Sequence, residues 1–222
     1  MRSVAIFTAL LMCLAGSSSG DGQVLDDIIG NVIDGVMRDI SGSVGESSDS
    51  KPESKAATGK QDEITAGLFH AIETGDVAQV RKLLARSPDL SARHSSGMPL
   101  MVYAAGWGKL EIMKHLAVRG CRADVADDRG NTALHLSAVR GYDGIVCWLL
   151  RKGVPVDVTN QAGQTPLLWA VDDGHASTVK LLLDNGARPD HRDRDGETPE
   201  RVARRKGYAE ILKYLAEARK MR

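Results

Sequence analysis

Residues 163–186 read GQTPLLWAVDDGHASTVKLLLDNG, and this stretch decides the fold. Gly163 is a turn residue, and the threonine two positions later is a strong helix cap. Pro166 fits the first turn of a helix, because the N–H that proline lacks would have no partner there. Gly174 then predicts the end of this helix, as a residue in the left-handed conformation commonly does. The first half of the stretch therefore predicts a turn followed by a short helix.

The second half predicts another helix that runs back against the first. Val179, Leu182 and Leu183 lie at i, i+3 and i+4, a spacing that buries one helical face. Gly186 ends this helix and leads into an extended turn. The small residue Ala170 in the first helix allows a neighbouring helix to approach closely. The stretch therefore predicts one turn and two antiparallel helices.

The same pattern recurs along the chain at intervals of 33 residues. A fixed period of this length indicates stacked structural repeats. The recurring positions are Gly75, Gly108, Gly141, Gly174 and Gly207; Leu83, Leu116, Leu149, Leu182 and Leu215; Gly97, Gly130, Gly163 and Gly196; and Gly120, Gly153 and Gly186. They predict five units, at about residues 62–93, 94–126, 127–159, 160–192 and 193–222.

The turn sequences of these units resemble the ankyrin repeat signature Gly-x-Thr-Pro-Leu-His. Residues 130–135 read GNTALH, 163–168 read GQTPLL and 196–199 read GETP. The resemblance implies an all-α solenoid of about five helix-turn-helix units with β-turn fingers, from about residue 62 to the C-terminus. Residues 97–102 (GMPLMV) lack the threonine, and only His135 keeps the histidine of the signature. The first unit has no turn signature and the last has Glu200 and Arg201, as expected of end units that meet water.

The residues before the repeats predict three further segments. Residues 1–19 combine Arg2, an apolar run of about twelve residues and a small-residue stretch, which is typical of a cleaved secretory signal. The run is short of the roughly twenty residues that span a bilayer, although an uncleaved N-terminal anchor stays an alternative. Residues 20–41 predict an amphipathic helix with apolar pairs every four residues, which would dock on the repeats or self-associate. Residues 42–61 are rich in Ser, Gly, Lys and Glu and predict a flexible linker.

Composition and motifs argue against nucleic-acid binding, membrane insertion and metal- or cofactor-dependent chemistry. The 29 basic and 29 acidic residues cancel, so we expect no nucleic-acid partner and no stable membrane insertion after signal cleavage. The histidines show no metal-ligand spacing, and we expect no cofactor and no metal. His135 is interpreted as a structural residue between units. Cys121 and Cys147 are too few for a disulfide framework, and a bridge between them is left open.

Two acidic pairs offer the enzymatic alternative. Asp127-Asp128 and Asp172-Asp173 could act as acid and base or hold a divalent ion. The repeat register places the first pair in a turn and the second at a helix end, at different structural positions. We therefore interpret both pairs as solvated or partner-contacting, and a carboxylate-dependent hydrolase stays the less favoured reading.

The resemblance implies that a partner protein is bound by the turn tips and the exposed ends of the first helices. Carried over unit by unit, the predicted partner-binding residues are Trp107, Met98, Asp128, Arg129, Asn131, Arg140, Gln161, Gln164, Asp172, Asp173, Arg194, Arg205 and Lys206. Trp107 leads this set, because tryptophan is a frequent binding hot spot. The alternating charges along the helix ends would orient a partner or form weak salt bridges between repeats. Trp148 and Trp169 are predicted to pack in the core.

The sequence thus predicts a monomeric, non-enzymatic module that binds another protein outside the cytoplasm. The compartment would be the periplasm in a bacterium, and otherwise the secretory lumen or the exterior. The resemblance implies that such a protein can inhibit a lytic enzyme or a toxin. An envelope scaffold or stress-protection factor that binds without inhibition is the alternative.

Overall fold

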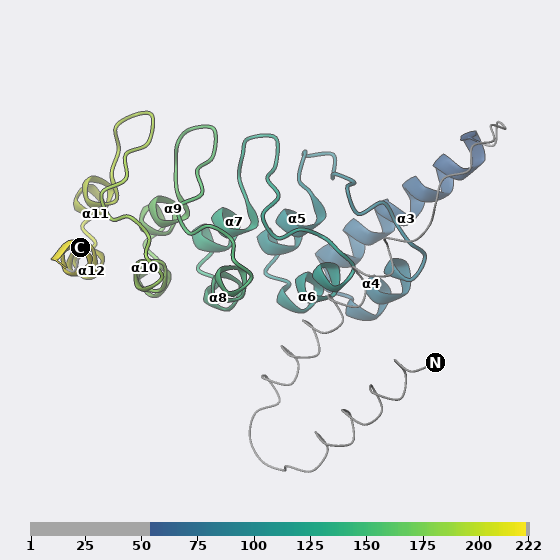
Figure 1. Ribbon diagram of the computed structural model, residues 1–222, viewed down its shortest axis with the longest axis horizontal. Coiled ribbons are helices and arrows are strands. Elements are labelled where there is room, and N and C mark those ends of the chain that lie inside the picture. Colours follow the sequence, from purple (N-terminus) through teal and green to yellow (C-terminus); the bar gives the residue numbers. More distant parts are fainter. Residues whose placement is uncertain (1–53, 221–222) are drawn as a thin grey trace, which may run out of the picture. The chain divides into compact units, whose positions relative to one another are not determined.

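The computed structural model describes residues 54–220, with side chains from residue 62 onward. The predicted signal peptide (1–19), the amphipathic helix (20–41) and most of the linker lie outside the described residues. Within the described part, the chain forms ten helices in five consecutive pairs and no strand (Figure 1). They are α3 (Ser54–Thr74), α4 (Val77–Leu84), α5 (Leu100–Gly106), α6 (Leu110–Val118), α7 (Ala133–Val139), α8 (Asp143–Arg151), α9 (Pro166–Asp172), α10 (Ala176–Asp184), α11 (Pro199–Lys206) and α12 (Ala209–Lys220). The predicted all-α repeat solenoid is confirmed.

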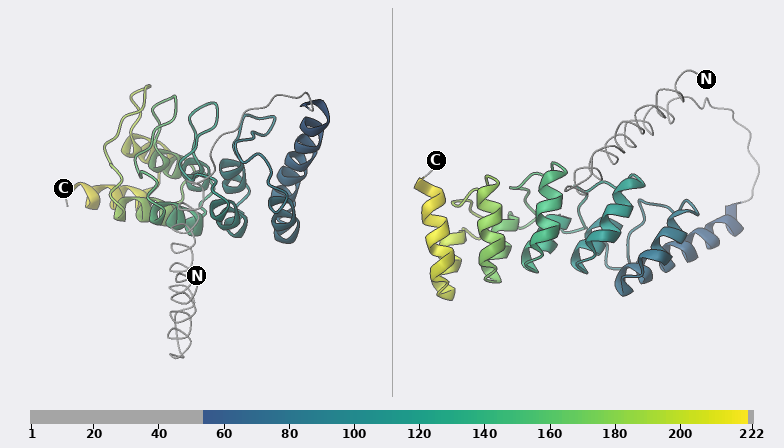
Figure 2. Two further views of the ribbon diagram at one scale, coloured as in Figure 1. Left: turned by 45° about the vertical axis from the view of Figure 1, so that its right-hand side comes forward. Right: turned by 90° about the horizontal axis from the view of Figure 1, so that it is seen from below.

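The helix pairs stack in one row, and four fingers join successive pairs. The first, second, third and fourth fingers comprise residues 85–99, 119–132, 152–165 and 185–198. Figures 1 and 2 show the fingers extending beside the first helices α5, α7, α9 and α11, with the second helices on the opposite side. Isolated antiparallel bridges join Arg93 to Pro99 and Ala126 to Thr132.

Capping residues set the starts and ends of the first helices as the sequence predicts. The Thr165 hydroxyl accepts a hydrogen bond from the Leu168 N–H at 3.3 Å, which satisfies one free donor at the start of α9. Pro99 precedes α5 and provides no side-chain cap, in line with the missing threonine of that unit. Gly174 follows α9 with a φ of +78°, the left-handed conformation expected after the helix.

The core runs through all five pairs. The five repeated leucines are almost completely buried, at 6% exposure or less. The small residues at the helix contacts, Ala71, Ala104, Ser137, Ala170 and Ala203, are at most 1% exposed. Each unit buries its apolar stripe against its neighbours, so no unit has a core of its own.

The predicted boundary between linker and repeats differs from the structure. α3 begins at Ser54, eight positions before the predicted start of the first unit, and so includes the last part of the predicted linker. The linker prediction followed the shortage of apolar residues in this segment. Lys55, Ala56, Ala57 and Lys60 are nevertheless strong helix formers, and helix propensity does not depend on burial.

Gly130 and Gly196 occupy the same turn position in two fingers and allow a matched test of finger packing. Both have a φ above +70°, so alanine at either site is expected to lower the free energy of unfolding by about 1 kcal/mol. A Cβ on Gly130 would also lie 3.1 Å from the Gln161 backbone nitrogen, whereas one on Gly196 would meet nothing within 4 Å. Gly130→Ala should therefore lower the free energy by about 2 kcal/mol. Urea denaturation measures both losses. Equal losses of free energy for the two variants would contradict close packing of the second finger against the third.

Candidate functional site

The ends of the first helices and the adjoining fingers form one continuous side of the stack, called the inner face below. The predicted helix-end residues Trp107, Arg140, Asp172, Asp173, Arg205 and Lys206 are all exposed there. Trp107 is 50% exposed, directly after the end of α5. An indole that remains half in water contributes little to the core, which makes Trp107 available to a partner.

Two further aromatic residues support this face, and the sequence did not predict this role for either. Tyr103 lies beneath the surface, at only 6% exposed. Tyr103 packs edge-on against Trp107, with ring centroids 6.3 Å apart. Trp169 was predicted to lie in the core, but its ring is partly exposed on α9, and its Nε1–H donates to the Gln164 amide oxygen at 2.8 Å. A usable signal was present, because residues three or four apart share a helical face. Tyr103 precedes Trp107 by four, and Trp169 precedes Asp173 by four.

The predicted alternation of charges is partly used inside the protein. Lys206 on α11 forms an ion pair with Asp172 on α9, with 2.8 Å between Nζ and Oδ1. This is the repeat-to-repeat pairing that the sequence left open. Both side chains are more than a third exposed, so the pair contributes little to stability. Arg140 and Asp173 stay exposed on the same face.

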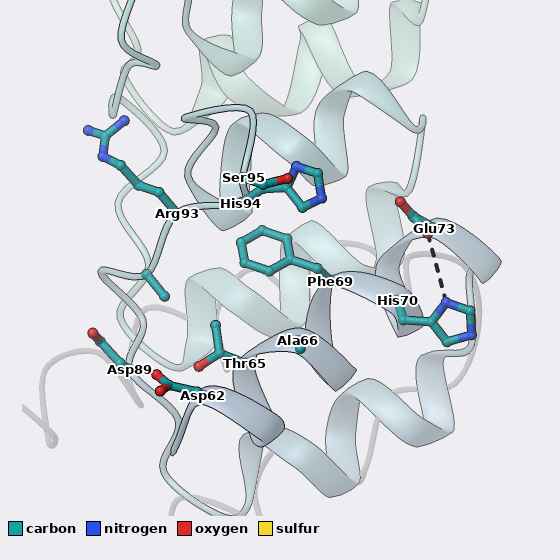
Figure 3. A pocket seen from close by; sticks show the side chains of 11 residues that line it. Asp62, Thr65, Ala66, Phe69, His70, Glu73, Asp89, Arg93, His94 and Ser95 are labelled. Carbon is teal, nitrogen blue, oxygen red and sulfur yellow. Dashed lines mark ion pairs between the residues drawn. The ribbon is translucent and has the colours of Figure 1, made fainter. Parts of the chain in front are cut away.

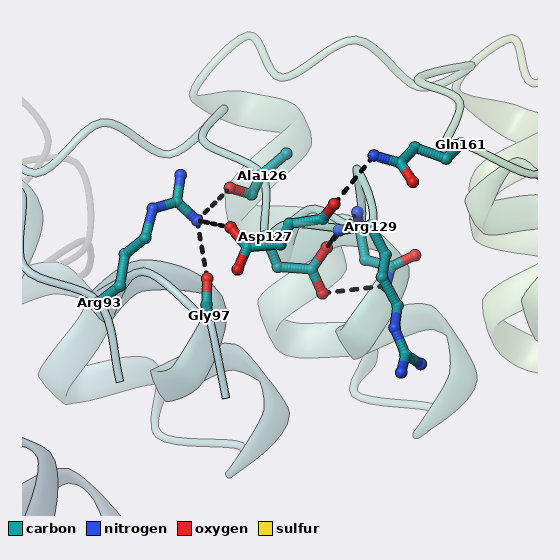
Figure 4. A network of polar contacts seen from close by, with 8 residues as sticks. Arg93, Gly97, Ala126, Asp127, Arg129 and Gln161 are labelled. Carbon is teal, nitrogen blue, oxygen red and sulfur yellow. Dashed lines mark hydrogen bonds and ion pairs between the residues drawn. The ribbon is translucent and has the colours of Figure 1, made fainter. Parts of the chain in front are cut away.

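Hydrogen bonds tie the fingers into a row. The Arg93 guanidinium reaches from the first finger to the Ala126 carbonyl and the Asp128 carboxylate of the second, both at 3.2 Å (Figure 4). Gln161 donates its backbone N–H to the Arg129 carbonyl at 2.9 Å and its amide to the Asp128 carbonyl at 2.9 Å. The Arg194 N–H continues the chain of contacts to the Ala162 carbonyl at 3.0 Å. Side chains on the fingertips therefore stand on a connected framework.

Three predicted fingertip residues are at least partly covered in the structure. Asn131 is only 8% exposed, because its amide bonds the Asp127 carboxylate and accepts from Asn160, each at 2.9 Å. Its amide is thus occupied within the row of fingers, and its contact with a partner stays a prediction. Gln164 is half-buried against Trp169, and Met98 packs partly on the core. Asn160 of the next finger covers Asn131, whereas Gln164 lines an open cavity beside Trp169.

A cavity of about 530 Å³ lies between α3 and the first finger. Phe69 and His94 pack edge-on in its wall, with ring centroids 5.2 Å apart, and Asp62 and Asp89 border one side (Figure 3). Next to it, the Tyr103 hydroxyl donates a hydrogen bond to the Glu73 carboxylate. Burial, and then this bond, raises the pKa of Tyr103 above its usual value. Aromatic contacts thus brace this end of the inner face.

Three histidines join neighbouring units. His135 lies 3.0 Å from the Gln164 carbonyl, His175 3.0 Å from the Val139 carbonyl and His191 2.8 Å from the Gly163 carbonyl, each through Nε2. A carbonyl only accepts, so Nε2 must carry the proton. The His135 Nδ1 is then an acceptor, and the Thr132 N–H donates to it at 3.2 Å. This geometry supports the structural interpretation of His135.

The buried ring of His135 predicts a pH dependence of stability. Burial lowers the pKa of His135, against the opposing effects of the Gln164 carbonyl and the Asp127 carboxylate. The unfolded chain therefore binds this proton first as the pH falls. Stability is full above about pH 6.5 and declines towards the lower folded pKa, by at most about 1.4 kcal/mol per pH unit.

The matched variant is His135→Gln, because glutamine at this position keeps an acceptor for the Thr132 N–H. We expect the wild-type free energy of unfolding to fall more steeply between pH 7.5 and 5.5 than that of the variant. Urea denaturation at both pH values measures this difference. Identical pH dependence would show that His135 is not the responsible group.

The two acidic pairs of the enzymatic alternative have different roles in the fold. The Asp127 carboxylate holds its own turn, accepting from the Arg129 and Asn131 N–H groups, each at 2.8 Å. Asp172 and Asp173 are exposed at the end of α9. In the described part of the chain, no three His, Cys, Asp or Glu side chains converge as metal ligands would.

Two further observations concern the thiols and the membrane. Cys121 and Cys147 are free, and burial raises the pKa of Cys121 to about 11. A thiol with so high a pKa is almost entirely protonated at neutral pH and is a poor nucleophile. Among residues 54–220, no helix has the length and apolar character needed to cross a membrane.

Comparison with known proteins gives a family match over most of this structure. The family described as Ankyrin repeats (3 copies) matches residues 68–160 and 139–221. Together the two matched ranges run from residue 68, in the last third of α3, to the end of α12. A search of curated proteins finds no match to the chain.

Proposed function

Since the chain belongs to the ankyrin repeat family, which makes it a protein–protein interaction module, we propose that it binds its partner with the inner face and performs no catalysis. The observation that carries the proposal is the half-exposed Trp107 beside Tyr103. Tryptophan, tyrosine and arginine dominate the energetics of protein interfaces. Arg140, at the helix-end position next in the row, adds an exposed guanidinium to this aromatic pair.

The framework under these residues supports the same reading. The linked fingers and the packed first helices hold the inner face in one conformation. A preorganised surface loses little conformational freedom on binding, so more of the contact energy is retained as affinity. The second helices, on the opposite side, present fewer such features, and Val118 on α6 is the large apolar residue exposed there.

We further propose that the protein acts as an exported monomer and inhibits the protein that it binds. The export proposal rests on the composition of residues 1–20, which have the three-part pattern of a secretory signal. The inhibition proposal rests on the family resemblance and is the sharpest form of the binding proposal. An envelope scaffold would use the same face but leave the partner active, and a hydrolase would turn over a substrate through Asp172 and Asp173.

Capture from the native envelope or secreted fraction tests this proposal. Three immobilised full-length chains are compared: the wild type, Trp107→Ala with Arg140→Glu, and a control on the second helices, Val118→Ala with Arg151→Glu. We expect the wild type and the control to retain the same protein, and the inner-face variant to lose it. Loss of the partner's activity on binding supports inhibition, whereas preserved activity identifies a scaffold. Equal retention by all three chains would overturn binding by the inner face.

A further inference from the structure

A second cavity on the inner face contains a carboxylate whose hydrogen bonding is incomplete. The cavity measures about 370 Å³ and lies where α7, α9 and α11 meet the third and fourth fingers. Val139, Trp169 and Val202 give it an apolar wall, and Asp172, Glu197 and Arg205 lie on its polar side. Its volume is in the range of pockets that enclose small ligands, so a whole side chain fits within it.

Glu197 has only one of its two carboxylate oxygens satisfied. Its Oε1 accepts a hydrogen bond from Arg205 Nη1 at 3.1 Å, and Arg201 Nη2 is farther away, at 3.8 Å. Its Oε2 is buried and has no hydrogen-bond donor among the described residues. A buried acceptor without a donor is unfavourable, because it has lost water and gained nothing in return. Because Oε2 has almost no accessible surface, a new donor can reach it only when a neighbouring side chain such as Arg205 moves away.

The chemistry of the cavity selects the group that would supply this donor. A guanidinium donates two parallel N–H groups and matches both oxygens of a carboxylate. Its planar face also stacks on an aromatic ring, and Trp169 stands in the cavity wall. Three carboxylates, those of Asp172, Asp193 and Glu197, line the cavity against the single guanidinium of Arg205. Asp172 is already paired with Lys206, and Glu197 with Arg205, so an incoming guanidinium would take the place of Arg205 and not add to the charge of the site.

We propose that this cavity receives an arginine side chain of the partner protein, which forms a two-pronged ion pair with Glu197 and displaces Arg205. The proposal rests on the inner face being the binding surface and specifies the chemistry of the partner. The Arg205 side chain is 57% exposed, so its guanidinium can be solvated by water once it leaves Glu197. It therefore acts as an internal placeholder for the incoming guanidinium rather than as a contact to an acidic partner.

Two substitutions with opposite expected effects distinguish this role from a structural one. Glu197→Gln removes the charge but keeps the shape, and glutamine already occupies the equivalent position of the preceding unit as Gln164. Arg205→Gln removes the competing guanidinium on the exposed side of α11. The first should weaken binding of an arginine and the second should strengthen it. Simple loss of structure would weaken both.

The probe is a library of random twelve-residue peptides displayed on phage and selected on the immobilised full-length chain. We expect the selected peptides to share an arginine. In synthetic versions, replacing that arginine with citrulline, which has nearly the same shape but no charge, should weaken binding to the wild type at least tenfold. The same replacement should change binding to Glu197→Gln less than twofold, and Arg205→Gln should bind the arginine peptide several-fold more tightly.

Each other outcome has a defined meaning. Selected peptides without a shared arginine, or an equal citrulline effect on wild type and Glu197→Gln, overturn the arginine proposal. If such peptides still lose affinity with Trp107→Ala, the inner face remains the binding surface. If no peptide is selected, or if binding ignores both Trp107→Ala and Glu197→Gln, this proposal and peptide binding by the inner face fail together.

Discussion

Replacing Leu149 with alanine is expected to lower the free energy of unfolding by about 3 kcal/mol. The Leu149 side chain is completely buried on α8, in the third of the five helix pairs. Alanine would remove apolar contacts and leave a cavity that the stacked helices can only partly close. Because each unit is stabilised by its neighbours, the loss at a central unit weakens both halves of the stack. Urea denaturation followed by circular dichroism measures the change.

The adjacent leucine of the same helix provides the control. Leu150 is only half-buried, so Leu150→Ala should lower the free energy of unfolding by about 1 kcal/mol. Both variants lose the same atoms from the same helix, and they differ mainly in burial. Similar losses for Leu149→Ala and Leu150→Ala would mean that the predicted side of α8 does not face the core.

The backbone of this domain could be predicted from the sequence because one short pattern is repeated. The left-handed glycines, the threonine caps and the repeated leucines each act within a few residues, and their recurrence every 33 residues reveals the stacking. The start of α3 could not be obtained in this way, because residues 54–61 lie before the repeated pattern. In that segment helix propensity predicts a helix, whereas the low apolar content predicts a flexible linker.

The exposure of individual side chains was harder to predict than their register. Leu136, Trp169 and Val202 hold the same repeat position, yet Val202 is buried, at 3% exposed, while Leu136 and Trp169 are partly exposed. Exposure depends on the size of the residue and on the residues of the next unit. The 33-residue period gives the position of a residue but neither of these properties. Asn131 shows the reverse case, since a polar fingertip residue is buried by the finger that follows it.

The pairing of charges was likewise outside the reach of the sequence. Asp172 and Lys206 are 34 positions apart and meet only because α9 and α11 lie side by side. The sequence placed alternating charges along the helix ends but could not decide between partner contacts and contacts within the protein. The importance of Glu197 likewise comes from the cavity around it and from one unsatisfied oxygen, neither of which the repeat pattern contains.

Trp107→Ala is expected to weaken binding of the captured partner at least thirtyfold, which corresponds to about 2 kcal/mol. The indole offers a large rigid apolar surface whose burial against a partner costs little conformational freedom. Because the side chain is 50% exposed in the free protein, its removal should leave the helical content unchanged and lower the free energy of unfolding by only about 1 kcal/mol, as for Leu150→Ala. Titration of the purified partner against wild type and variant measures the dissociation constants.

Val118 provides the matched control for Trp107, since both are large apolar residues that the described structure leaves about half exposed, at 54% and 50%. Val118 ends α6 on the side away from the fingers, whereas Trp107 follows α5 on the inner face. If any exposed apolar side chain bound the partner nonspecifically, Trp107→Ala and Val118→Ala would both reduce binding. If the inner face is the binding surface, only Trp107→Ala does so. Full affinity in Trp107→Ala, with affinity lost in Val118→Ala, would place the partner on the second helices.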